Sequence, residues 1–361
     1  MNNSNPIKRI FELYTSDLTH DEIERLIKRE AGEVYEFFAQ DIPKNEIHRN
    51  RLIRGAIFLR SLFNAFILKL NPARRIFYLA SLLFFILGNI EPSETYLILS
   101  FLILNLLLAF ELADKLSAKG ELDVARKIQS KLIPKHTVKI FKFDISSYYE
   151  PAREVGGDYF DVINKNEKIY IAVGDISGKG MAAAIYMVRL QSILHLLLDY
   201  FIDVKEIIIN LKKYFSKNLR KDLFLTITFL SIEKDGKIKL VRAGHPPAFW
   251  FHSDGKNVTT INSKGMGIGF NDRGIFENTL EVYEFYPKPN DILFVYSDGL
   301  TEAMNVYKNQ FGEEAIKQII LQNNDKSTEE IKNLLLNRLK LFRGTAYQND
   351  DITFVILKTT S

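Results

Sequence analysis

The sequence predicts an α+β layered sandwich in its C-terminal two thirds, preceded by a helical N-terminal region that contains an apolar hairpin. Three observations lead to this arrangement. Residues 135–361 alternate short strand-like runs with amphipathic helical segments. Aspartate-containing turns adjoin several of those runs. Upstream, two long apolar runs, Ile76–Ile90 and Thr95–Phe110, are separated by a short loop.

Composition limits the functional classes. A chain of 361 residues with 47% hydrophobic residues suggests two or three domains with a substantial core. The absence of cysteine excludes disulfide frameworks, thiolate zinc sites and phosphatases with a cysteine nucleophile. The net charge is only +4, and the C-terminal half has no concentrated basic or aromatic patch, so we expect no nucleic-acid partner. Residues 1–30 are polar and charged, so we expect no cleavable signal peptide.

Residues 1–75 are expected to form a helical region. Residues 6–40 fit one or two small amphipathic helices, for which a packing role is the plain interpretation, and Thr19 is a candidate N-cap. Residues 51–70 place Leu52, Leu59 and Phe66 on one helical face, with most of the basic residues off that face. A basic amphipathic helix of this kind lies either on an anionic membrane surface or in a protein core.

Residues 76–110 predict a transmembrane helical hairpin. Glu91 and Glu94, the only charged residues between Ile76 and Phe110, fall in the loop between the two apolar runs. Each run is slightly shorter than the roughly 17–25 residues that span a bilayer. Basic residues flank the hairpin on both sides, which favours both ends in the cytoplasm. A re-entrant or buried helical hairpin is the alternative.

Residues 111–134 predict a charged linker helix with one apolar side. Gly120 interrupts its pattern and Pro134 ends it, and the repeat is too short to establish a coiled coil. The plain interpretation is a connecting helix.

Residues 135–361 are expected to be the second domain. The turn KDGK predicts a hairpin of the strands Leu223–Glu233 and Lys237–Ala243. The other expected strands are Val138–Tyr149, Ile169–Val173, short runs near Phe249, Val258, Leu280 and Leu293, and Ile352–Leu357; the expected helices are Met181–Tyr200, Val204–Leu219, Glu313–Gln322 and Thr328–Phe342.

Four acidic turns are the candidate site. Asp158 and Asp175 each follow a glycine, Asp298 follows the apolar strand Ile292–Tyr296, and Asp350 and Asp351 precede the last strand. In a single turn of this kind, the aspartate usually accepts hydrogen bonds from the neighbouring backbone and has no other role. Together, carboxylates at strand ends suit hard divalent cations, and without a positive charge between them they would repel one another.

The ordered motifs PAREVGGDYFD, VGDISGKGMAAAI, VRAGHPP, FVYSDGLTEA, FGEE and NDDITFVIL resemble the SpoIIE/RsbU-type serine/threonine phosphatases, a bacterial branch of the metal-dependent protein phosphatase (PPM) superfamily. The resemblance covers roughly residues 125–357. It implies the αββα sandwich of that superfamily. It also implies that the linker helix supports a homodimer and carries signals into the catalytic domain.

The resemblance implies two divalent cations, Mn²⁺ or Mg²⁺. Asp175 would bridge both, Asp158 would help to hold one with the backbone carbonyl of Ile176, and Asp298 and Asp350 would hold the other. Asp351 is expected to support the site or to be structural. No side-chain nucleophile is expected, since the cations would activate water.

Three further residues stay open at this stage. His245 in AGHPP is either a proton donor to the leaving oxygen or a turn residue held by Pro246 and Pro247. Lys179 and Arg153 either face the substrate phosphate or are solvated surface charges.

The resemblance implies a protein serine/threonine phosphatase, and the predicted hairpin adds an anchor at the inner (cytoplasmic) membrane with the catalytic domain in the cytoplasm. The implied substrate is a phosphorylated regulatory protein, an anti-sigma-factor antagonist of the STAS type, in a partner-switching pathway. One alternative is a catalytically inactive dimeric scaffold that binds a phosphoprotein, for which loss of a ligand aspartate would be the signature. Another is a nuclease or nucleotidase that uses the same carboxylates.

Overall fold

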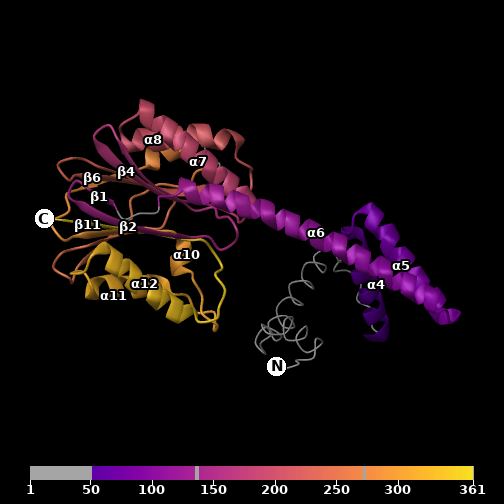
Figure 1. The fold of residues 1–361 in the computed structure, drawn as a ribbon. Coiled ribbons are helices and arrows are strands. Elements are labelled where there is room, and N and C mark those ends of the chain that lie inside the picture. Colours follow the sequence, from indigo (N-terminus) through magenta and orange to yellow (C-terminus); the bar gives the residue numbers. More distant parts are fainter. Residues whose placement is uncertain (1–50, 135–137, 271–273, 361) are drawn as a thin grey trace, which may run out of the picture. The chain divides into compact units, whose positions relative to one another are not determined.

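The computed structural model describes residues 51–134, 138–270 and 274–360 (Figure 1). These residues divide between two compact units, with the boundary between Ser117 and Ala118. The helices expected in residues 6–40 lie outside the described residues. In the first unit, α4 (Arg51–Lys69), α5 (Pro72–Ile90) and the start of α6 (Glu94–Leu132) follow one another. Asn71 caps α5 by accepting a hydrogen bond from the backbone N–H of Arg74, and Pro72 begins the helix.

Helices α5 and α6 pack through small residues. Ser81 and Ser100 each donate a hydrogen bond to the other's backbone carbonyl, at 3.0 and 2.9 Å, and both side chains are buried. A Cβ on Gly88 would lie 2.9 Å from the side chain of Leu97. The large apolar side chains instead point outward: Ile76, Phe77, Leu83, Phe85, Ile98, Phe101, Leu102 and Leu108 are all more than half exposed. A small-residue seam inside an apolar exterior is typical of helices packed in lipid.

Three described helices are long and apolar enough to cross a membrane: Pro72–Ile90, Glu94–Leu132 and Met181–Tyr200. The third differs from the other two, because 39% of its most apolar window is buried inside the protein, against 11% and 6%. Its buried residues, including Met187, Leu190 and Leu194, belong to the core of the second unit. It is therefore a core helix, whereas α5 and α6 leave their apolar surfaces without protein cover in the described residues.

The two helices expected at Thr95–Phe110 and 111–133 are a single helix. α6 runs for 39 residues from Glu94 to Leu132 and passes through Gly120 without a break. Gly120 lowers helix propensity, but nothing lies within 4 Å of the position that its Cβ would take, so the helix accommodates it.

The second unit is built on two antiparallel sheets. One has the strand order β1-β2-β11-β10-β7-β8 and the other β3-β4-β5-β6-β9. Their bounds are β1 Val138–Ile140, β2 Phe143–Glu150, β3 Tyr159–Lys165, β4 Lys168–Ile176, β5 Leu225–Ile232, β6 Ile238–Ala243, β7 Ala248–Phe251, β8 Val258–Ile261, β9 Val282–Phe285, β10 Ile292–Tyr296 and β11 Ile352–Thr359. All eight residues of β11 are buried, because this strand lies inside its sheet and is covered on both faces.

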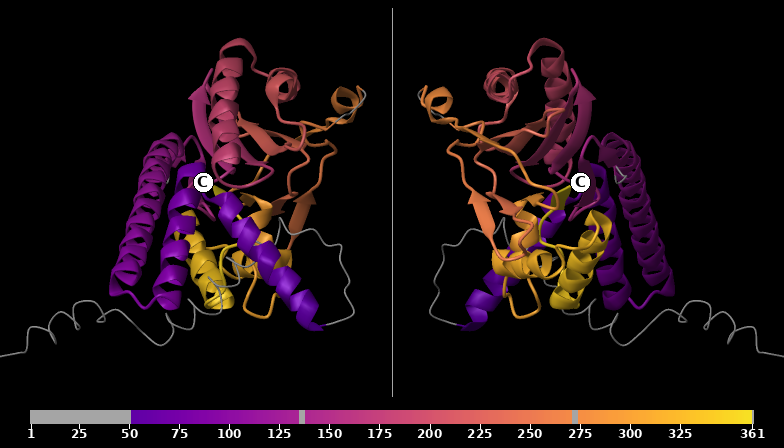
Figure 2. Two further views of the ribbon diagram at one scale, coloured as in Figure 1. Left: turned by 90° about the vertical axis from the view of Figure 1, so that its right-hand side faces the viewer. Right: turned by 90° about the vertical axis from the view of Figure 1, so that its left-hand side faces the viewer.

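Helices cover the outer face of each sheet. α7 (Met181–Tyr200) and α8 (Val204–Phe215) pack on the β3–β9 sheet, and α11 (Gly312–Gln322) and α12 (Thr328–Arg343) lie on the other side of the sandwich (Figures 1 and 2). Two short helices, α9 (Phe276–Thr279) and α10 (Asp298–Thr301), and the 3₁₀ turn Ser216–Asn218 complete the unit. This confirms the expected helix–sheet–sheet–helix layering.

Several expected strands and helices differ in detail. The strand expected at Val138–Tyr149 is two strands, β1 and β2, joined by a tight turn at which Phe141 has a φ of 52°. β3 was not expected, since YFDVINK lacks a clear alternation. The strand expected near Leu280 begins at Val282, after α9. The helix expected at Val204–Leu219 ends at Phe215 and continues as the 3₁₀ turn.

Candidate metal centre

The two sheets bring the four predicted aspartates to one end of the sandwich. Asp158 directly precedes β3, and Asp175 is the second-last residue of β4, the neighbour of β3. Asp298 follows β10, and Asp350 precedes β11, which pairs with β10. Antiparallel neighbours place the end of one strand beside the start of the next, so each sheet contributes two carboxylates.

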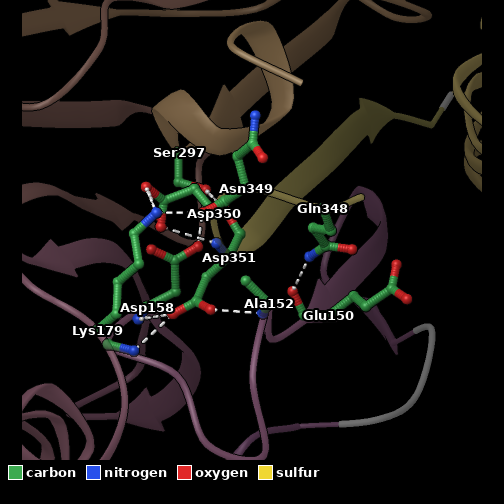
Figure 3. A network of polar contacts seen from close by, with 10 residues as sticks. Glu150, Ala152, Asp158, Lys179, Ser297, Gln348, Asn349, Asp350 and Asp351 are labelled. Atoms are coloured by element: carbon green, nitrogen blue, oxygen red, sulfur yellow. Dashed lines mark hydrogen bonds and ion pairs between the residues drawn. The ribbon is translucent and has the colours of Figure 1, made fainter. Parts of the chain in front are cut away.

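Asp158 joins the two sheets. Its Oδ2 accepts a hydrogen bond from the hydroxyl of Ser297 at 2.7 Å (Figure 3). It accepts a second one from the hydroxyl of Thr353 at 2.5 Å, and the side chain of Asp158 is buried. Burial, together with the charges of Asp175 and Asp351, raises the pKa of Asp158 well above its usual value, and the two hydroxyls oppose that rise only in part.

Asp351 supports the loop that carries Asp158. Its Oδ1 accepts a hydrogen bond from the backbone N–H of Ala152 at 2.7 Å, and its Oδ2 accepts one from Gly157 at 2.6 Å (Figure 3). The carboxylate thus fixes the backbone of the EVGGD turn, which agrees with the structural role expected for Asp351.

The other carboxylates also affect one another. Burial and the charges of Asp298, Asp350 and Asp351 raise the pKa of Asp175 to about 7. Burial and the charges of Glu302 and Asp350 raise that of Asp298. The raised pKa values mean that ionising these aspartates costs free energy unless a cation stabilises the ionised form, so this end of the sandwich favours a positive charge.

The donor set fits hard divalent cations. Carboxylates and a backbone carbonyl are the oxygen ligands that Mg²⁺ and Mn²⁺ prefer. A Cβ on Gly157 would lie only 2.7 Å from the carbonyl oxygen of Ile176, so the glycine lets the two predicted ligand segments approach closely. As the side chains stand, no three His, Asp or Glu residues in the described part of the chain are grouped tightly enough to ligate one ion.

The remaining candidates lie in different environments. His245 is buried, its Nδ1 lies 2.9 Å from the hydroxyl of Thr226, and burial lowers its pKa to about 3. This neutral, enclosed ring fits the turn role and not that of a proton donor. Lys179 pairs with Asp350, with 2.8 Å between Nζ and Oδ2, and Arg153 is exposed with its Nη1 3.9 Å from the position of a Cβ on Gly180.

Sequence reasoning missed three residues that organise the site: Ser297, Thr353 and Gln129. Lys179 was a candidate, but its ion pair with Asp350 was not predicted. The first two adjoin predicted ligands, in YSDGL and NDDIT, so a polar residue next to a ligand aspartate was the available signal. Gln129 had none, because its partner, Gly156, lies 27 residues away.

Comparisons with known proteins agree with this geometry. The model of the family "Stage II sporulation protein E (SpoIIE)" matches residues 165–360, more than half of the chain. Among curated proteins, the chain is similar to the phosphoserine phosphatase RsbU of Bacillus subtilis, at 24% identity over 66% of this chain and 70% of RsbU. It is also similar to the protein IcfG of Synechocystis, at 26% identity over 69% of this chain, although the match spans only 43% of IcfG.

Solved structures show the same fold. The SiaA-PP2C domain of Pseudomonas aeruginosa matches with a TM-score of 0.59 at 17% identity, over 68% of this chain and 98% of that one. The PP2C phosphatase domain of SpoIIE from Bacillus subtilis matches with a TM-score of 0.52 at 22% identity, over 61% and 64%. The family match, the shared fold and the order of the motifs together show that the chain belongs to the SpoIIE family, the SpoIIE/RsbU-type phosphatases of the PPM superfamily.

Proposed function

We propose that the chain is a membrane-anchored, metal-dependent protein serine/threonine phosphatase. The observation that carries the proposal is the convergence of Asp158, Asp175, Asp298 and Asp350, from two sheets, at one end of the sandwich. Mutual repulsion and burial already raise the pKa of Asp158, Asp175 and Asp298. Such a cluster is stable in its ionised form only around cations.

The positions of the aspartates support the following roles in this proposal. Two divalent cations, Mn²⁺ or Mg²⁺, when bound, lower the pKa of water and neutralise the charge of phosphoryl oxygens. Asp175 would be the shared ligand, because its charge acts on Asp158 and the charges of Asp298 and Asp350 act on Asp175. Asp158, with the carbonyl of Ile176, would hold one cation, and Asp298 and Asp350 would hold the other. Ser297 and Thr353 orient Asp158 for its role.

The substrate in this proposal is a phosphoserine or phosphothreonine on a regulatory protein. RsbU and RsbP of Bacillus subtilis are both named phosphoserine phosphatases, and their likeness to this chain supports a protein substrate. The family resemblance further favours an anti-sigma-factor antagonist of the STAS type. The sequence contains no cysteine, and metal-activated water is the expected attacking group in this proposal.

Membrane anchoring is supported by the helical hairpin of α5 and α6. Its seam is made by Ser81, Gly88 and Ser100, and its outer surface is apolar. Near the start of α5, Arg74 forms ion pairs with Glu111 and Asp114 of α6, at 2.6 and 2.5 Å. These pairs neutralise the charges of all three side chains at one end of the hairpin. We propose that the hairpin spans the cytoplasmic membrane and that the catalytic unit lies in the cytoplasm.

A homodimer through the linker helix completes the proposal. On α6, Leu112, Leu116, Val124 and Ile128 are each more than half exposed. If they form the dimer contact, a chain that starts at Pro134 sediments as a monomer, whereas one that starts at Leu112 sediments as a dimer. Dimers from both chains would place the interface elsewhere.

The central test is phosphate release from a phosphoserine protein by the full-length chain in detergent. Release is expected with Mn²⁺, not with EDTA, and not from Asp298→Asn. The matched control is Asp325→Asn, which removes an exposed carboxylate in the loop between α11 and α12 and is expected to keep full activity. Phosphoprotein binding without release from the wild type would instead support the inactive scaffold.

A further inference from the structure

Lys179 reaches from the loop after Asp175 to the turn that carries Asp350. Its Nζ lies 2.8 Å from Oδ2 of Asp350 and donates a hydrogen bond to the backbone carbonyl of Asn349 (Figure 3). Burial raises the pKa of Asp298, and the positive charge of Lys179 partly opposes that rise. The ammonium therefore acts on both aspartates that the proposed function assigns to the second cation.

The backbone directs this side chain. Lys179 stands between Gly178 and Gly180, whose φ values of 94° and 75° lie in the left-handed region that favours glycine. The two glycines turn the chain sharply between β4 and α7. In the described residues, Lys179 makes the one ion pair with any of the four aspartates.

This arrangement has a consequence for metal binding. Both carboxylate oxygens of Asp350 already have a partner: Oδ2 has the ammonium at 2.8 Å, and Oδ1 accepts a hydrogen bond from the backbone N–H of Asp351 at 3.0 Å. A cation at Asp350 would therefore compete with the ammonium, and two positive charges on one carboxylate repel each other. Among the described residues, no three His, Asp or Glu side chains are placed to ligate one ion, although the carboxylates lie near enough to raise the pKa of Asp175.

We propose that Lys179 is an internal counter-ion for the second-cation side of the site, and that a divalent cation binds to Asp298 and Asp350 only as the ammonium withdraws. This inference rests on the proposed function. The first-cation side, at Asp158 and Ile176, makes no such ion pair in the described residues and is not subject to this competition. The lysine therefore lowers the affinity for one cation selectively and stabilises the metal-free site.

The size of the effect follows from exposure. The side chains of Lys179 and Asp350 are 37% and 39% exposed, so water screens their attraction. Partly exposed ion pairs contribute little to the free energy of folding or binding. For Lys179 and Asp350 we therefore expect a change of roughly three- to fivefold in the equilibrium constant for binding the second cation.

The test is a titration of the full-length chain in detergent with Mn²⁺, after metal has been removed with EDTA. The electron paramagnetic resonance signal of free Mn²⁺ measures how much of the ion is bound. Lys179→Gln is expected to tighten the weaker class of sites roughly three- to fivefold, with the stronger class unchanged. Lys179→Arg, which keeps the charge, is expected to stay near the wild type. In EDTA, Lys179→Gln is expected to lower the melting temperature, and excess Mn²⁺ is expected to remove that difference.

The matched control is Lys234→Gln. Lys234 pairs with Glu167 at 2.8 Å, at the opposite end of the β4–β5 pair from Asp175, so its loss removes the same charge without affecting the site. Unchanged or weaker Mn²⁺ binding by Lys179→Gln would overturn the counter-ion role while leaving the phosphatase proposal intact. A wild-type chain that binds no Mn²⁺ would overturn both.

Discussion

Gln129 and Gly156 exchange two hydrogen bonds. Nε2 of Gln129 donates to the carbonyl of Gly156 at 2.7 Å, and the N–H of Gly156 donates to Oε1 of Gln129 at 3.1 Å. Gln129 lies near the C-terminal end of α6, and Gly156 lies two residues before Asp158. A side-chain amide thus ties the end of the linker helix to the loop that positions a predicted metal ligand.

Replacing Gln129 by alanine tests this link. The change removes both hydrogen bonds to the buried backbone of Gly156, which costs about 1–3 kcal/mol of unfolding free energy. We also expect weaker Mn²⁺ binding, because the loop before Asp158 loses its anchor. Urea unfolding and Mn²⁺ titration measure the two effects. Lys127→Ala, on the exposed face of the same helix, is the control. Equal behaviour of the two variants would show that Gln129 does not position the loop.

Gly157 is the position at which a single methyl group tests the predicted ligand Ile176. A Cβ there would lie 2.7 Å from the carbonyl oxygen of Ile176 and 2.9 Å from Cβ of Ala183. Gly157→Ala is expected to reduce metal-dependent phosphatase activity roughly tenfold or more, because small displacements at a catalytic centre have large effects.

Gly120→Ala is the control for that substitution. It adds the same methyl group inside α6, where nothing lies within 4 Å, and is expected to stabilise the helix by up to about 1 kcal/mol without loss of activity. Full activity of Gly157→Ala in phosphate-release assays would contradict the ligand role of the Ile176 carbonyl.

The stability of the metal-free chain is expected to fall as pH rises. Asp175 has a pKa raised from 3.8 to about 7, so between these values the folded state holds a proton that the unfolded state releases. The stabilisation is complete below about pH 4 and is lost as pH rises through 7, with a slope of up to about 1.4 kcal/mol per pH unit. In EDTA, the melting temperature of the wild type should therefore fall between pH 5 and pH 8.

Two comparisons identify the cause of that pH dependence. Asp175→Asn has no carboxyl to ionise, so its melting temperature in EDTA should fall less over the same range. Saturating Mn²⁺ should flatten the wild-type curve, because the cation stabilises the ionised cluster. A wild-type melting temperature in EDTA that does not change between pH 5 and pH 8 would mean that Asp175 is ionised without metal.

The hairpin of α5 and α6 makes a separate prediction. The full-length chain is expected to stay in the membrane fraction after an alkaline wash and to need detergent for extraction, because its outward side chains are apolar. A chain that starts at Leu122 is expected to be soluble. Recovery of the full-length chain in the soluble fraction without detergent would exclude the transmembrane hairpin.

The residue pattern alone determined much of this protein. The apolar spacing of Met181–Tyr200 and Thr328–Phe342 predicted helices close to those observed, since one buried face is enough to define a helix. The turn KDGK predicted the β5–β6 hairpin, because its partners are close along the chain. Asp175, Asp298 and Asp350 stood out because each adjoins an apolar strand, and Asp158 stood out because it follows two glycines.

The tertiary structure decided the rest. The break at Phe141, the pairing of β3 with β4 and the continuity of α6 through Gly120 depend on neighbours that a local pattern does not contain. The contacts of Gln129 with Gly156 and of Lys179 with Asp350 join residues 27 and 171 positions apart, as the numbering shows. The conformational preference of a residue depends on neighbours a few positions away in the sequence, whereas hydrogen bonds and ion pairs depend on atoms a few ångströms away in space. Only the folded chain brings residues so far apart in sequence within a few ångströms of each other.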